Sequence, residues 1–166
     1  MQLENLVSRA AKTLLFAATL STGLATSARA QVVRLPLPNN SPFPISQGVW
    51  VGKTLYLSGM LEPSDILSSP TPGDTQAQTV GAIQTIEAAL KAQKLTLGDV
   101  VMMHVYLAAD PANGGKMDFK GFMAGYTQFF GTKDQPNKPA RSAMQVAALA
   151  APTALVEIEV IAVKPD

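Results

Sequence analysis

Apolar and β-branched residues recur along the chain in five short runs that predict β-strands. Residues 48–53 read as a short strand with a tight turn, and residues 54–59 as a stronger one. Residues 100–107 are almost continuously apolar, which favours a strand buried on both faces. Residues 142–146 form a further strand, and the long run at 155–163 closes the chain.

Two other stretches carry apolar residues at the spacing of three and four that marks a helix. The first runs from about Thr75 to Gln93, and Asp74 is suited to cap its start. The second begins after Asp118, which can cap it, and ends at Gly131. Its apolar face predicts a largely aromatic core stripe of Phe119, Phe122, Met123, Tyr126, Phe129 and Phe130.

The remaining segments read as loops. Residues 31–47 carry prolines at 36, 38, 42 and 44, which block helix formation and predict an extended lead-in. Residues 63–74 contain a Ser-, Pro- and Gly-rich loop. The order is therefore β-β-α-β-α-β-β, and both helices can cover one face of a single, mostly antiparallel sheet. We predict an α+β fold of two layers.

The second face of that sheet has no predicted cover. Alternate residues of the 100–107 strand are apolar on both sides, with Met102, His104 and Tyr106 on one face and Met103, Val105 and Leu107 on the other. A domain of this size has nothing left to bury the second face. We therefore predict that the protein associates with copies of itself.

The first thirty residues have the pattern of a secretory signal peptide. Arg9 and Lys12 precede an apolar run that starts at residue 13, and Ala28-Arg29-Ala30 suits a signal peptidase. Cleavage after Ala30 would leave residues 31–166 as a single domain, located in the periplasm or outside the cell. An uncleaved anchor or a buried N-terminal helix is the alternative, although the run is shorter than the roughly 20 residues of a membrane span.

Composition and charge argue against several classes of partner and of chemistry. The whole chain carries a net charge of +1, and loss of a leader with three basic and one acidic residue gives −1. A near-neutral domain without a basic cluster argues against a nucleic-acid partner and against an electrostatic membrane anchor. The absence of cysteine excludes disulfides and thiolate chemistry, and a single histidine argues against a metal site. The sequence shows no nucleotide-binding, zinc-protease or serine-hydrolase motif.

Arg141 and Glu157 are the main candidates for chemistry. Arg141 follows Pro139 and lies in sequence that is free of other charges up to Val156, so it either makes a rim salt bridge or is kept for an anion such as a carboxylate. Glu157 and Glu159 are two apart on a predicted strand and share a face, either in solvent or towards a site.

A turn at Ala150-Ala151 would pair the last two predicted strands with each other. Glu157 would then lie opposite Met144 and diagonally within reach of Arg141. Ser58 and Gly59 end a strand, where glycine either permits close approach of a ligand to the backbone or marks a simple bend. His104 is expected to be a core or interface histidine.

Taken together, these segments resemble the Rid/YjgF family of reactive-intermediate deaminases, across roughly residues 43–163. The resemblance rests on short sequence segments and single residues in this order: residues 44–47, residues 51–59, Gln78, residues 97–101, Asp118-Phe119, Tyr126, Phe129-Phe130, residues 139–142, Gln145-Val146 and residues 156–159. It implies a chorismate-mutase-like α+β fold and a homotrimer with ligand sites between subunits. It also implies hydrolysis of 2-imino acids and enamines to 2-keto acids and ammonia without a cofactor. Arg141 would hold the substrate carboxylate, Glu157 would position water, and Ser58-Gly59 would line the pocket.

Three positions depart from the pattern of active family members. Ile45 stands where a tyrosine is usual, Met123 where an asparagine is usual, and Ala143 where cysteine or threonine is frequent. This less polar wall predicts either a preference for apolar substrate side chains or weaker catalysis. The alternatives to a deaminase are a noncatalytic trimer that binds a small carboxylate in the same cleft, and a structural or holdase role through apolar surface.

Overall fold

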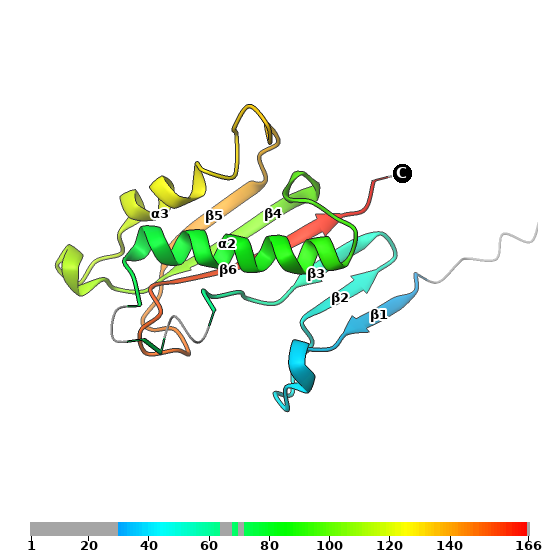
Figure 1. Ribbon diagram of the computed structural model, residues 1–166, viewed down its shortest axis with the longest axis horizontal. Coiled ribbons are helices and arrows are strands. Elements are labelled where there is room, and N and C mark those ends of the chain that lie inside the picture. Colours follow the sequence, from blue (N-terminus) through cyan, green and yellow to red (C-terminus); the bar gives the residue numbers. More distant parts are fainter. Residues whose placement is uncertain (1–29, 64–67, 70–71, 166) are drawn as a thin grey trace, which may run out of the picture.

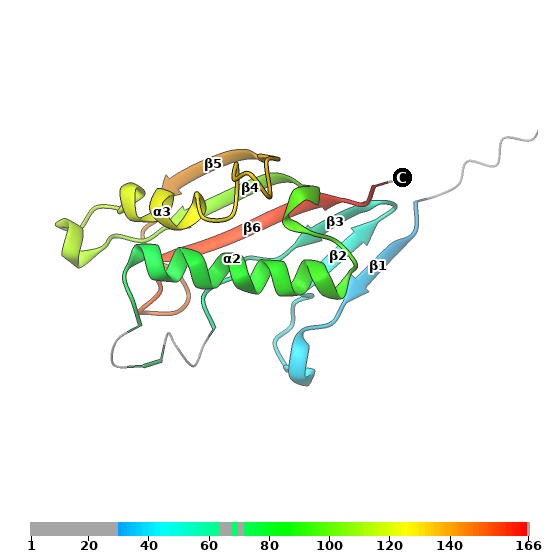
Figure 2. The same ribbon diagram turned by 45° about the horizontal axis from the view of Figure 1, so that its top comes forward.

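The computed structural model describes residues 30–63, 68–69 and 72–165, and these form one six-stranded sheet with two α-helices (Figure 1). The helices lie on the same side of the sheet (Figure 2). The strands are β1 Val32–Leu35, β2 Gly48–Val51, β3 Thr54–Leu57, β4 Val100–Leu107, β5 Ala140–Gln145 and β6 Val156–Val163; the helices are α2 Thr75–Ala92 and α3 Phe119–Tyr126, with 3-10 turns at Pro38–Asn40, Leu97–Asp99 and Pro111–Asn113.

The strand order is β1-β2-β3-β6-β4-β5, and every pair is antiparallel except β4 with β5. The predicted α+β class, with a mostly antiparallel sheet and two helices on one face, is confirmed. The expected loop at 63–74 falls partly on residues outside those described, and the expected signal peptide falls almost wholly on them. No described helix has the length and hydropathy to cross a membrane.

One strand lies where an extended lead-in was expected. β1 pairs with β2 in the register Val33 opposite Trp50 and Arg34 opposite Val49. Two valines precede the first proline of this segment, so the β-branched residues can join the sheet before Pro36 removes a backbone donor. The strand is short and ends at Leu35, and the prolines that follow keep the next residues out of the sheet.

The predicted pairing of the last two strands is wrong. β5 runs parallel to β4 at the edge of the sheet, whereas β6 lies between β3 and β4. Glu157 is therefore opposite Tyr106, and Met144 is opposite Tyr106 from the other side. The burial pattern gives the reason: alternate residues of β6 are fully buried, which suits a central strand, while β5 is mostly exposed and suits an edge.

Both helices begin at the predicted caps. The carboxylate of Asp74 accepts a hydrogen bond from the amide of Ala77 at 2.8 Å, and that of Asp118 from the amide of Gly121 at 2.9 Å. α3 ends at Tyr126, earlier than the stripe predicted, and Phe130 is buried beyond it. The aromatic stripe is core except at its start, where Phe119 is 42% exposed.

The two faces of the sheet differ in how deeply their side chains are buried. Met103, Val105 and Leu107 of β4 are completely buried on the face towards the helices. Their alternates on the opposite face, which we call the open face, are half-buried. The open face is not simply apolar, as the sequence suggested, because His104 and Tyr106 there bind a carboxylate of β6.

Candidate active site

Arg141 lies on the helix side of the sheet. Its backbone pairs with Met103, a buried residue, so its side chain points under α3. The guanidinium carbon lies 4.4 Å from the centroid of the Tyr126 ring and 5.0 Å from that of Phe122. One guanidinium nitrogen also lies 3.3 Å from the sulfur of Met123. Aromatic faces attract a cation, so α3 fixes the position of this charge.

The charge of Arg141 is not neutralised within the described part of the chain. Arg141 forms no ion pair with another described residue, and the contact of His104 with Glu159 does not involve it. The side chain is half-buried rather than fully solvated. Ala143, which pairs with Val105, follows Arg141 on the same face of the sheet. Arg141, Met123 and Ala143 therefore form one group, with a cation available to an anionic ligand.

Glu157 lies on the open face and packs against glycine. Its backbone pairs with Tyr106, which places its side chain on the opposite side of the sheet from Arg141. A Cβ atom built on Gly59 would lie 2.8 Å from the carboxyl carbon of Glu157, closer than van der Waals contact allows. The absence of a side chain at Gly59 is what leaves room for the carboxylate.

Neighbouring backbone holds this corner in place. Met60 and Ile158 exchange two hydrogen bonds, of 2.8 and 3.0 Å, just beyond Gly59. The hydroxyl of Ser58 donates to the carbonyl of Ser46 at 2.7 Å, which brings the segment before β2 to the end of β3. Ile45, the residue before Ser46, is 56% exposed. Glu157, Gly59 and Ser58 thus form a second group, and Ile45 lies in the segment that Ser58 joins to it.

Burial controls the protonation of these side chains. Loss of solvent raises the pKa of the Glu157 carboxyl above its usual value, and the nearby charge of Glu159 raises it further. Burial also raises the pKa of the Tyr126 hydroxyl, and the charge of Arg141 opposes this shift. A carboxyl with a raised pKa is closer to the range in which a general base works at neutral pH.

The structure does not bring Arg141 and Glu157 together within one copy of the chain. Met103 and Tyr106, their neighbours on β4, face opposite sides of the sheet, and β4 itself separates β5 from β6. The sequence placed the two side chains diagonally across one hairpin, and that placement is wrong because the hairpin does not exist. One copy therefore offers two half-sites.

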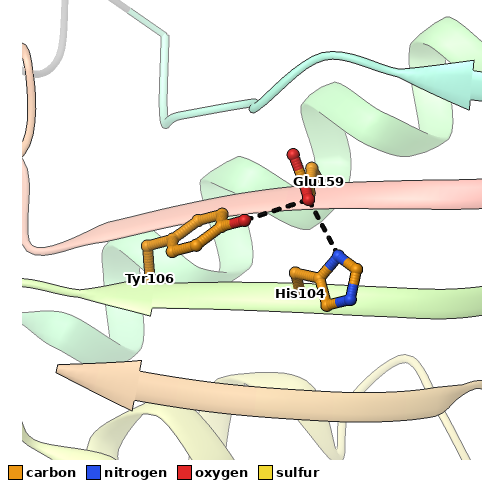
Figure 3. Close-up of polar contacts among 3 residues, drawn as sticks. All are labelled: His104, Tyr106 and Glu159. Carbon is orange, nitrogen blue, oxygen red and sulfur yellow. Dashed lines mark hydrogen bonds and ion pairs between the residues drawn. The ribbon is translucent and has the colours of Figure 1, made fainter. Parts of the chain in front are cut away.

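Two features of the site were missed at the level of sequence. One is the aromatic support of Arg141 by Phe122 and Tyr126, which were read only as core. The other is a hydrogen-bonded set of His104, Tyr106 and Glu159 (Figure 3). The alternation of His104 and Tyr106 on one strand put them on a common face, but only the pairing of β4 with β6 places Glu159 between them.

No metal site is evident in residues 30–63, 68–69 and 72–165, since no group of three or more His, Cys, Asp or Glu side chains there is placed to hold an ion. The architecture and these half-sites define a class: a small two-layer α+β protein with an aromatic-backed arginine on one side of its sheet and a partly buried carboxylate on the other.

The chain belongs to the Rid/YjgF/RutC family, because the family model described as endoribonuclease L-PSP matches residues 39–164. A RutC family protein of Saccharolobus solfataricus is 38% identical over 122 residues, which cover 73% of this chain and 87% of that protein. The Escherichia coli protein named "Putative reactive intermediate deaminase TdcF" is 33% identical over 121 residues, with the same coverage of both chains.

Solved structures agree with the family. Yeast Mmf1 superimposes with a TM-score of 0.65 at 27% identity, over 81% of this chain and 100% of that one. The structure of E. coli TdcF with bound serine gives a TM-score of 0.62 at 30% identity, over 82% of this chain and 98% of that one. The family and the YjgF-like fold expected from the sequence are confirmed.

Proposed function

We propose that the protein hydrolyses 2-imino acids, and their enamine tautomers, to 2-keto acids and ammonia. The observation that carries this proposal is Arg141: a half-buried cation, held by aromatic rings and without an acidic partner in the described chain, suits a substrate carboxylate. Membership of a family that includes a relative named as a reactive intermediate deaminase supports the same reaction.

Arg141 and Glu157 would have separate roles in this reaction. Arg141 holds the carboxylate of the imino acid through two parallel hydrogen bonds, which fixes the position of the imine carbon. Glu157 orients a water molecule and accepts its proton as the oxygen attacks that carbon. That proton passes to the imine nitrogen, which gives an amino alcohol. The hydroxyl of the amino alcohol then gives up its own proton to the nitrogen as the carbon–nitrogen bond breaks, so that ammonia leaves and the keto acid remains. Backbone at Ser58 and Gly59 lines the pocket.

The reaction does not require a cofactor. An imine carbon is already electrophilic, so holding the substrate and water in the correct geometry supplies most of the acceleration. The raised pKa of Glu157 would favour proton transfer near neutral pH.

Two copies of the chain would build each complete site. Arg141 and Glu157 lie on opposite faces of one sheet, so Arg141 of one copy would meet Glu157 of the next in a cleft between subunits. The open face also exposes large apolar side chains suited to such contact, with Tyr56 46% and Met144 44% exposed. A closed homotrimer would satisfy this requirement with three equal sites.

The side chains of the pocket wall indicate which substrates should be preferred. Ile45, Met123 and Ala143 offer no polar hydrogen to a substrate side chain, and the sulfur of Met123 already contacts Arg141. We therefore expect apolar 2-imino acids to be preferred over polar ones. With a signal peptide removed after Ala30, the enzyme would act on imines in the periplasm or outside the cell, with neither nucleic acid nor membrane as a partner.

The test is release of keto acid from 2-imino acids generated freshly in the assay, with the full chain and with the variants Arg141→Ala and Glu157→Gln. Acceleration that both variants lose, while Glu157→Gln still binds a keto acid, supports the proposal. Binding of small carboxylates without acceleration, for short and apolar side chains alike, would instead favour a noncatalytic carboxylate-binding trimer. Dye binding to exposed apolar surface of the assembled protein would be needed to favour a holdase.

A further inference from the structure

The open face carries a connected set of polar side chains that the proposed reaction does not use. Nδ1 of His104 lies 2.8 Å from Oε1 of Glu159, and the hydroxyl of Tyr106 donates to the same oxygen at 3.0 Å (Figure 3). The side chains of His104 and Glu159 are 33% and 39% exposed, so both are partly removed from water. One carboxylate oxygen therefore accepts two hydrogen bonds from the neighbouring strand.

This set lies directly beside the water-orienting carboxylate. Glu157 and Glu159 are two apart on β6 and share a face, and their cross-strand partners on β4 are Tyr106 and His104. The four side chains form a block of two pairs, one next to the other. A small cavity of about 130 Å³ adjoins the His104 end, lined also by Tyr56 and Ile161. Gly59 closes the other end by its contact with Glu157.

Two carboxylates so close on one face repel each other when both are ionised. The hydrogen bonds of His104 and Tyr106 hold Glu159 in one orientation, so its charge stays beside Glu157 rather than turning into solvent. Histidine is the side chain that ordinarily changes charge near neutral pH. Its protonation would offset the charge of Glu159, and its deprotonation would leave that charge uncompensated.

We propose that His104 is a positioning residue for the reaction: its protonation, acting through Glu159, sets how readily Glu157 ionises. The inference rests on the proposed function for its meaning in catalysis, although the ionisation of Glu157 can be measured without turnover. A protonated imidazole favours the Glu157 carboxylate, and a neutral imidazole favours the carboxylic acid. Burial is the larger cause of the raised pKa of the Glu157 carboxyl, and the charge of Glu159 raises it further, as this geometry leads one to expect.

Within one copy of the chain, the other groups around this block do not compete with His104. Arg141 of the next copy, which the proposed function places beside Glu157, carries the same charge in every variant compared, so it does not change the difference between them. On β5, the neighbours Ser142 and Met144 carry no charge. On β3, the neighbour Tyr56 is a phenol. On β4, the pKa of the Tyr106 hydroxyl is raised by its hydrogen bond to Glu159 and by burial, so Tyr106 does not ionise near neutral pH.

More distant charges lie beyond effective range. Arg34 on β1 is three strands from β6, roughly 14 Å at a spacing of about 4.8 Å per strand. That separation exceeds the screening length of about 8–10 Å in ordinary buffers. Lys53 and Lys164 lie at the far end of the sheet, where their backbones are bonded to each other, and Glu62 packs against Gly81 on the helix side.

The experiment is a carbon-13 NMR titration of the Glu157 side chain in the full chain labelled at glutamate carboxyl carbons, with Glu157→Gln to assign the signal. The variants are His104→Asn and His104→Gln, which keep a polar side chain without its charge, and Glu159→Gln. Tyr56→Phe is the matched control, since Tyr56 shares the face and the cavity but lies outside the hydrogen-bonded set. The pH profile of keto-acid release is measured in parallel.

We expect the midpoint of the Glu157 titration to rise in both His104 variants, to fall in Glu159→Gln and to stay unchanged in Tyr56→Phe. A rise of half a pH unit would lower the rate on the acid side about threefold and leave the alkaline plateau unchanged. The inference is overturned if the titration midpoint of Glu157 is unaffected in both His104 variants. It is also overturned if the midpoint shifts in the same direction in Glu159→Gln as in the His104 variants, because general loosening of the site cannot give opposite shifts. Absence of turnover in the unaltered protein overturns the proposed function alone, since the titration still decides the role of His104.

Discussion

The guanidinium carbon of Arg141 lies over the ring of Tyr126, 4.4 Å from its centroid. The Tyr126 ring is itself stacked on Phe130, with centroids 4.9 Å apart and planes inclined by 12°. Aromatic faces attract a cation, so this pair of rings helps to fix the position of the guanidinium. The helix α3 and the turn that follows it thus support the cationic side chain of Arg141 on β5.

This stack predicts an effect of Tyr126 on substrate affinity. Tyr126→Phe keeps the ring and should leave kinetics nearly unchanged, whereas Tyr126→Leu removes the aromatic face and lets Arg141 move. We expect Tyr126→Leu to raise KM roughly tenfold, equivalent to about 1.4 kcal/mol, with a smaller effect on kcat. Steady-state kinetics on one imino acid checks this, and equal KM values for the two variants would contradict the supporting role of the ring.

A side chain at Gly59 is predicted to displace Glu157. In Gly59→Ala the new Cβ would overlap Glu157, so the carboxylate must move from its position on the open face. We expect kcat to fall by about 10²-fold, as for other displaced catalytic groups. The matched control is Gly98→Ala, whose Cβ would lie 3.4 Å from its nearest neighbours and so fits in ordinary contact. Similar losses in the two variants would show that the overlap at Gly59 is not the cause.

The raised pKa of Glu157 predicts a pH dependence of folding stability. A carboxyl whose folded-state pKa lies above its unfolded value, 4.5 in a free side chain, binds protons more tightly when folded. Its stabilising contribution is complete below the unfolded pKa and is lost as the pH rises through the folded one. Glu157→Gln should therefore gain Tm relative to the unaltered protein at neutral pH, and this gain should vanish at about pH 4.

Thermal unfolding of both proteins over that pH range provides the measurement. Glu87→Gln serves as the control, because it makes the same exchange of side chain at an exposed position of α2. A Tm difference for Glu157→Gln that stays constant with pH would contradict the raised pKa.

The two half-sites predict complementation between inactive variants. Arg141→Ala and Glu157→Gln should each be inactive alone, yet subunits mixed by unfolding and refolding together should recover activity. With random mixing, a cleft is complete when one neighbour retains Arg141 and the other retains Glu157, which gives about a quarter of the normal sites. Activity of mixed samples against each variant refolded alone checks this, with the unaltered protein unfolded and refolded in parallel as the control. No recovery in the mixture, when the unaltered protein does recover, would contradict a site shared between two copies.

Local sequence signals were sufficient for most of the elements. Asp74 and Asp118 cap their helices, and alternating residues mark β6, because these patterns depend only on near neighbours. The pairing of strands was not predicted correctly, since a turn at Ala150-Ala151 is compatible with either a hairpin or a crossover. That error misplaced Glu157 relative to Arg141, although both residues were identified. The partnership of His104 with Glu159 depends on the same pairing, so it could not be found from the sequence.

The central position of β6 has a consequence for how the chain is made. β6 pairs with both β3 and β4, which do not pair with each other, and among the described strands it comes last along the chain. Until residues 156–163 have left the ribosome, β3 and β4 lack the strand between them and the sheet consists of separate halves. Closure of the sheet must therefore wait for β6, and a chain truncated before Val156 would lack the strand that joins its two parts.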